Sequence, residues 1–291
     1  MALGTPIRID SLGHFLSLVR EFRKAWDRAG NEELWFRAED ADHSRTRLQA
    51  GLFRARKDAD RKPVQELLTL EAGLYEEFDR CASQLSPVDT KTIDEDWDPY
   101  FLMQHYGVPT RILDWTDGAL ICLHFAVRDK ALNPASDSMI YVLDPYWLID
   151  LLDSHRDRAD TIGRWKKYCR ERVEKDRNED DWERLYLPYG ADDPKQPLQD
   201  MPNIPLLWDS PHLTRRIAAQ RSRFLIFGKD PDFLVTVGVG KDSRLDSFVI
   251  EKEKIPAIRQ ELRDAGVTES VVFPDLDGLG RELKQQWELE R

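Results

Sequence analysis

FLMQHYGVPTRILDWT, residues 101–116, is the most informative stretch of this 291-residue chain. A helical pattern enters it from Trp97, and Gly107 and Pro109 end that helix. The apolar residues that follow predict an extended strand. The stretch therefore changes from helix to strand while carrying Gln, His, Arg, Asp and Thr side chains. Polar groups at such a junction lie at the rim of a core, where binding sites are common.

The spacing of apolar residues predicts the elements on both sides of this junction. Steps of three and four residues predict helices at 11–29, 64–82, 97–106, 119–128, 254–265 and 276–287. Short apolar runs predict strands at 34–37, 139–143, 224–227, 233–239, 248–250 and 270–273. Strands and helices mix without a strict βαβα alternation, so we expect an α+β fold with flanking helices.

One region differs in character from the rest. Residues 150–205 combine dense mixed charge with a run of prolines, which predicts a solvated helix followed by an irregular connection. We interpret this region as an insertion within a single domain that spans residues 1–291.

Composition excludes several classes of protein. With 54 acidic and 43 basic residues the net charge is −11, which argues against a general affinity for nucleic acid. No run approaches the ~18 apolar residues of a membrane helix, and the first eight residues do not follow the plan of a signal peptide. Three widely spaced cysteines are typical of a reducing compartment. We therefore expect a cytoplasmic protein that does not contact a membrane.

A metal site is not expected. No cysteine or histidine cluster has ligand spacing. Asp275 and Asp277 stand just before and within the first turn of a predicted helix, where carboxylates cap the chain and suit the helix dipole. His124 falls on an apolar helical face and is predicted to be a core residue.

Four blocks of sequence resemble the FRG domain family. Residues 101–116 match its QHYGxPTRLLDWT-type signature, and Phe36-Arg37-Ala38 stands where the family has Phe-Arg-Gly. RIAAQRSRF (216–224) is similar to an RIxAQxGxF block, and FPDLDGL (273–279) matches a block near the family's C-terminus. The blocks occur in the family order, although Ala38 and Ser222 replace two family glycines.

The chain also resembles Arg-type ADP-ribosyltransferases. These enzymes have a strand with a Tyr/Phe-Arg motif, a Ser/Thr-containing strand that leads into an Ala-x-x-Phe-Ala helix, and a strand bearing a Glu. Here Phe36-Arg37, then Thr116 with the helix from Ala119, then Gln220 before the strand at 224–227 stand in that order. The resemblance implies a split, ADP-ribosyltransferase-like mixed sheet and NAD as the substrate.

That resemblance also implies roles for individual residues. Arg37 would bind the NAD phosphates, because a planar guanidinium gives bidentate geometry. Asp114 and Thr116 would contact the nicotinamide ribose, and the Asp114 charge would stabilise an oxocarbenium-like transition state. Gln220 would orient the ribose, although it brings no charge where the transferases carry Glu. His105 and Arg111 would line or brace the pocket.

Several alternatives stay open from the sequence. An Arg111–Asp114 ion pair, with His105 capping the helix, would make the central block purely structural. Glu39 or Asp40 would be other sources of negative charge.

The leading function is an NAD-dependent ADP-ribosyltransferase that acts on RNA, DNA or protein as a toxin or phage-defence effector, with a neutralising antitoxin as a further partner. The rivals are a non-enzymatic nucleotide- or RNA-binding module, and an NAD glycohydrolase or RNA 2′-phosphotransferase.

Overall fold

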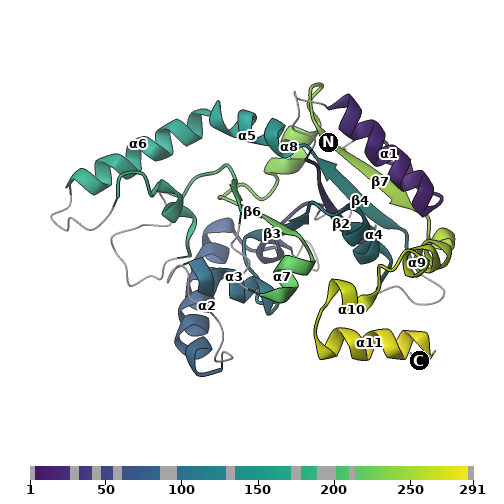
Figure 1. The fold of residues 1–291 in the computed structure, drawn as a ribbon. Coiled ribbons are helices and arrows are strands. Elements are labelled where there is room, and N and C mark those ends of the chain that lie inside the picture. The colour runs from purple at the N-terminus through teal and green to yellow at the C-terminus, as the bar shows by residue number, and fades with distance from the viewer. Residues whose placement is uncertain are drawn as a thin grey trace.

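The computed structural model describes residues 4–26, 33–40, 47–54, 61–85, 97–128, 135–171, 178–188, 201–209 and 214–287. Within these ranges one mixed sheet is flanked by helices, as the α+β prediction requires (Figure 1). Parts of the predicted 150–205 insertion, residues 172–177 and 189–200, lie outside them. None of the described helices is long and apolar enough to cross a membrane.

The sheet has the strand order β1-β7-β4-β2-β3-β6-β5. All neighbours pair antiparallel except β1 and β7, which are parallel. The strands are β1 (Ile7–Arg8), β2 (Trp35–Asp40), β3 (Ile112–Thr116), β4 (Ser138–Leu143), β5 (Leu206–Trp208), β6 (Ser222–Ile226) and β7 (Leu245–Ile250).

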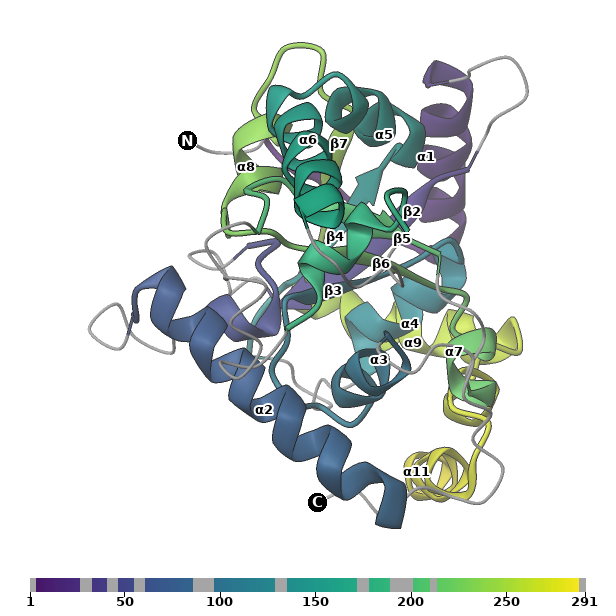
Figure 2. The ribbon, with the colours of Figure 1, turned by 90° about the vertical axis from the view of Figure 1, so that its left-hand side faces the viewer.

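The helices surround this sheet. They are α1 (Leu12–Ala25), α2 (Val64–Leu85), α3 (Trp97–His105), α4 (Ala119–Arg128), α5 (Pro145–Asp153), α6 (Arg156–Glu171), α7 (Arg215–Ala219), α8 (Phe233–Gly238), α9 (Ile255–Asp264), α10 (Glu269–Val272) and α11 (Leu276–Gln286). Three short 3₁₀ turns cover Gly51–Phe53 (η2), Trp182–Tyr186 (η4) and Lys252–Lys254 (η6). Figure 2 shows α2 and α3 to the left of α7, and α11 below it.

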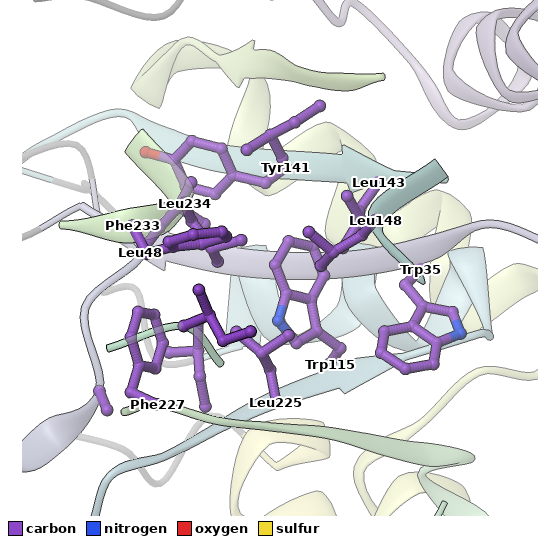
Figure 3. Close-up of a cluster of buried hydrophobic side chains, with 14 of the residues drawn as sticks. Trp35, Leu48, Trp115, Tyr141, Leu143, Leu148, Leu225, Phe227, Phe233 and Leu234 are labelled. Atoms are coloured by element: carbon purple, nitrogen blue, oxygen red, sulfur yellow. The ribbon is translucent and has the colours of Figure 1, made fainter. Parts of the chain in front are cut away.

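Apolar side chains fill both faces of the sheet. One face carries a single cluster that includes Trp35, Trp115, Tyr141, Leu225 and Phe227, shown in Figure 3. The other face carries two clusters. The first packs α1, α4 and α9 on β2, β4 and β7, and the second packs α2, α3, α6 and η4 on β3, β6 and β5.

The sheet has the fewest paired residues where these two clusters meet. β2 pairs with β4 along its whole length, but it pairs with β3 through one register position, Phe36 opposite Thr116. The strands diverge beyond that pair. The division of the core on this face follows the same line.

The junction of residues 101–116 forms as predicted. α3 ends at His105, and Gly107 follows with φ +78°, a left-handed conformation that glycine adopts without the cost of a β-carbon. The amides of Gly107 and Val108 donate to the carbonyls of Gln104 and Met103, which closes the helix end. β3 begins five residues later.

Two predicted strands are wrong. Phe233–Gly238 is helix α8, and its buried residues Phe233, Leu234 and Gly238 have helical rather than alternating spacing. Ser270–Phe273 falls on the short helix α10, where the Val272 amide donates to the Thr268 carbonyl. Both runs are rich in β-branched residues and too short for periodicity to separate helix from strand, so tertiary packing decides.

Residues at the predicted insertion pack into the core where they are described. Trp165 of α6 and Tyr186 of η4 are fully buried in the cluster that covers β3 and β6. The Tyr186 hydroxyl donates to the Ile204 carbonyl at 3.0 Å. The packing of Trp165 and Tyr186 ties the charged region to β3, the strand of the central block.

Candidate functional site

A cavity of about 280 Å³ opens between the two clusters, above the divergence of β2 and β3. Its walls come from β2, β3, β6, α3, α4 and α7. The predicted site residues Arg37, His105, Asp114, Thr116 and Gln220 all line it. They come from four separate segments of the chain, so the fold brings together side chains that are up to 183 positions apart in sequence.

Arg37 bridges the gap between the two diverging strands. Its Nη1 donates to the Asp114 carbonyl at 2.7 Å, and its Nε donates to the Glu39 carboxylate at 2.9 Å. Glu39 is buried and also accepts from Arg54 and from the Leu48 amide. The guanidinium is therefore held rigidly at the edge of the cavity. Ala38, which replaces the family glycine, lies in regular extended backbone of β2, so a side chain is accommodated there without strain.

Asp114 presents its carboxylate to the cavity. The Gln104 side-chain amide donates to one oxygen of this carboxylate. The Thr110 hydroxyl holds Gln104 in place by donating to its Oε1 at 2.6 Å. Loss of hydration among the surrounding protein atoms raises the pKa of Asp114. The positive charge of Arg37 and the hydrogen bond from Gln104 act in the opposite direction. A charge in such a setting exerts a stronger field on a ligand than it would in open water. Gln104 belongs to the same block and was missed as a site residue.

Thr116 acts on its neighbours through hydrogen bonds. Its hydroxyl donates to the Gln220 carbonyl at 2.7 Å and accepts from the Gly118 amide at 3.0 Å. The first contact positions Gln220 at the end of α7, and the second orients the Thr116 hydroxyl. Among the described residues, the buried Gln220 Nε2 has no hydrogen-bond partner. A buried amide without a partner is costly, and a ligand oxygen would satisfy it.

The chain reverses sharply after Gln220. Arg221 has φ +50°, so the left-handed residue precedes Ser222 rather than coinciding with it. Ser222 is the first residue of β6 and is buried against the cavity. The segment before this turn is helix α7, which contributes Arg216 to the cavity wall.

His105 is half-buried at the mouth of the cavity. Burial and the positive charge of Arg216 lower the pKa of His105, and Asp275 opposes them more weakly. The imidazole is therefore neutral at pH 7 and can either donate or accept a hydrogen bond.

Arg111 lies outside the cavity and is fully buried. Its Nε donates to the Glu71 carboxylate, and its two terminal nitrogens donate to the Phe227 and Tyr186 carbonyls. The proposed Arg111–Asp114 ion pair is wrong, because residues three apart in an extended segment point to opposite faces. We therefore assign Arg111 to the support beneath the cavity and not to the groups that contact a ligand.

The other residues that the sequence singled out have structural roles. The Asp275 carboxylate accepts from the Gly278 amide at 2.7 Å, which confirms its prediction as a cap of α11. His124 is buried, as predicted, and its Nε2 lies 3.0 Å from the Glu269 carboxylate. Among the described residues, no group of three His, Cys, Asp or Glu side chains is arranged to hold a metal ion.

The comparisons with known proteins give a family assignment for one part of the chain. Residues 32–134 match the family model of the FRG domain, which confirms the resemblance seen in the sequence and covers β2, α3, β3 and α4. No curated protein and no solved structure matches the chain.

Proposed function

We propose that this FRG-domain chain is an NAD-dependent ADP-ribosyltransferase that modifies a macromolecule. The observation that supports the proposal most is the convergence of Arg37, Asp114, Thr116 and Gln220 on one cavity. Arg37, Thr116 and Gln220 stand in the order of the motifs of the Arg-type transferases, and Asp114 lies two residues before Thr116 on β3. The break between β2 and β3 also agrees with the split sheet of that class.

The chemistry divides among the residues as follows. The carbon–nitrogen bond between nicotinamide and ribose breaks first, and its electron pair leaves with the nicotinamide. The ribose carbon then carries positive charge, which the Asp114 carboxylate stabilises from the floor of the cavity. An oxygen or nitrogen of the acceptor forms the new bond to that carbon, and its proton passes to the solvent. Gln220 orients the ribose through its partnerless amide, and Thr116 holds Gln220 in place.

Gln220 in place of Glu leaves Asp114 as the main negative charge of the cavity. Glu39 is excluded from that role, because it is buried in contacts with Arg37 and Arg54. Asp114 also lies at the cavity surface, where a ribose can reach it. We therefore propose Asp114 as the catalytic carboxylate, Arg37 as a phosphate contact and Thr116 as a positioning residue.

Asp114→Asn separates catalysis from binding. The variant keeps the shape and the Gln104 contact but removes the charge, so NAD turnover should fall by about 10²-fold or more while the Kd for NAD changes little. Asp153→Asn, at an exposed ion pair on α5, is the matched control and should leave both unchanged. Equal losses in turnover and affinity would assign Asp114 to ground-state binding only.

A cellular assay tests the biological role. As a toxin or phage-defence effector, the wild type should arrest growth on expression and the Asp114→Asn variant should not. Rescue by a co-expressed antitoxin would extend the proposal to a neutralising partner. Wild-type protein that binds NAD without consuming it would instead identify a nucleotide-binding module.

A further inference from the structure

Three arginines surround one aromatic ring beside the cavity. The guanidinium carbons of Arg128, Arg216 and Arg281 lie 4.1, 4.5 and 5.0 Å from the centre of the Phe273 ring. They come from α4, α7 and α11, three elements that are distant in sequence. We call Arg128, Arg216 and Arg281 the arginine cluster.

The arginine cluster adjoins the cavity directly. Arg216 belongs to both, because it also lines the cavity wall. Phe125, another lining residue, packs edge-on against Phe273 with their ring centres 5.8 Å apart. A ligand that leaves the cavity past α7 therefore meets these guanidinium groups.

The positive charge of the cluster is only partly compensated. Glu269 forms ion pairs with Arg128 at 2.6 Å and with Arg281 at 2.7 Å, and it also contacts His124. Burial, followed by repulsion from Arg128, lowers the pKa of Arg216, and the attraction of Asp275 and Asp114 does not offset these effects. Arg216 thus remains in an environment that disfavours its charge.

Arg216 also has an unused donor. Its Nε is buried and has no hydrogen-bond partner among the described residues. A guanidinium that lies over an aromatic ring uses its face for that contact and keeps its N–H edge for an anion. Such an edge matches the geometry of phosphate oxygens.

The size of the cavity bears on which kind of phosphate-containing ligand could reach the arginine cluster. A volume of about 280 Å³ lies just below the ~300–1,000 Å³ usual for ligand pockets, so a dinucleotide bound here would extend beyond the cavity to its rim. The net charge of −11 disfavours a nucleic-acid backbone at the same place.

We infer that the arginine cluster is a phosphate-binding subsite that holds the pyrophosphate of the dinucleotide at the cavity rim, with Arg216 as its principal contact. This inference rests on the proposed function for the identity of the dinucleotide. It moves the main phosphate anchor from Arg37, whose Nε and Nη1 donate to groups of the protein, to Arg216 of α7.

Calorimetric titration of the full chain tests the subsite with three probes. NAD and ADP-ribose both carry the pyrophosphate, whereas nicotinamide riboside carries no phosphate. Arg216→Gln should weaken NAD and ADP-ribose binding by roughly tenfold or more, and salt should weaken the wild type more than the variant. Nicotinamide riboside binding should not change. Arg215→Gln, on the exposed side of the same helix, is the matched control and should match the wild type.

Two further readouts keep the result unambiguous. Thermal unfolding checks that Arg216→Gln folds, and Arg216→Lys, which keeps the charge, should recover part of the lost affinity. Wild-type affinity for NAD in the folded Arg216→Gln variant would overturn the subsite while leaving the proposed function intact. Arg216-dependent binding of ADP-ribose without any binding of NAD would support the subsite and contradict the proposed function. Arg216-dependent binding of a short RNA, with NAD and ADP-ribose insensitive to Arg216, would overturn the dinucleotide as the source of the phosphate.

Discussion

Replacing Glu71 by Gln perturbs the support beneath the cavity without touching the cavity itself. The Glu71 carboxylate accepts hydrogen bonds from the Tyr100 hydroxyl at 2.6 Å, the Arg111 amide at 2.7 Å and the Arg111 Nε. Glu71 and Arg111 are both completely buried. Gln would retain an acceptor oxygen but would leave the Arg111 charge without its counter-ion in the protein interior.

The expected loss of stability is large. Removing one partner of a buried ion pair costs roughly 3–5 kcal/mol, because the remaining charge is uncompensated. The entropy of unfolding is about 2.1 cal/mol/K per residue, so a loss of about 4 kcal/mol lowers the Tm of a 291-residue chain by roughly 6 °C. The site residues keep their contacts, so NAD binding below the Tm should change little.

Thermal unfolding and NAD titration of the same samples measure both effects. Glu66→Gln is the matched control, because Glu66 lies on the same helix in an exposed pair with Lys62 and should affect neither quantity. An unchanged Tm together with lost NAD binding would refute the placement of Arg111 and Glu71 as structural support and would return Arg111 to the ligand site.

Three other outcomes follow from the same contacts. Hydrogen bonds from His124, Arg281 and Arg128 outweigh the burial of Glu269 and lower its pKa from 4.5 to about 2, so Glu269→Gln should destabilise the fold at pH 7. That difference should shrink in urea unfolding as the pH falls from 4.5 toward 2, where the wild-type carboxylate is protonated; a constant difference would exclude an electrostatic cause. Gln220→Ala should reduce NAD turnover and Gln220→Glu should retain or raise it, as measured by nicotinamide release, whereas two fully active variants would place the ribose elsewhere. Elemental analysis of the purified protein should find no stoichiometric transition metal, and one metal per chain would contradict the mechanism.

Much of the candidate site could be predicted because its residues occur in motifs with a fixed order. Phe36-Arg37, Asp114 with Thr116, and Gln220 each stand at a strand, or next to one, that the apolar pattern identifies. Their convergence follows once β2, β3 and β6 are neighbours in the sheet.

The rest depends on partners that are distant in sequence. Arg111 stands three residues from Asp114, but its acid is Glu71, forty positions earlier on α2. The sequence shows Arg216 only as one of several arginines between positions 215 and 223, and the fold shows that it packs on Phe273 and lines the cavity. Helix α8 forms from a valine-rich run, because burial of Phe233 and Leu234 outweighs its intrinsic strand preference.

Incubation of the purified protein with labelled NAD and a cell extract, followed by separation of protein from nucleic acid, tests the central claim most directly. The account predicts that wild-type protein releases nicotinamide and transfers the label to one macromolecular fraction, and that Asp114→Asn does neither at a comparable rate. Labelled ADP-ribose that stays free in solution would identify a glycohydrolase, with water as the acceptor. NAD that remains intact with every fraction of the extract would contradict the transferase account.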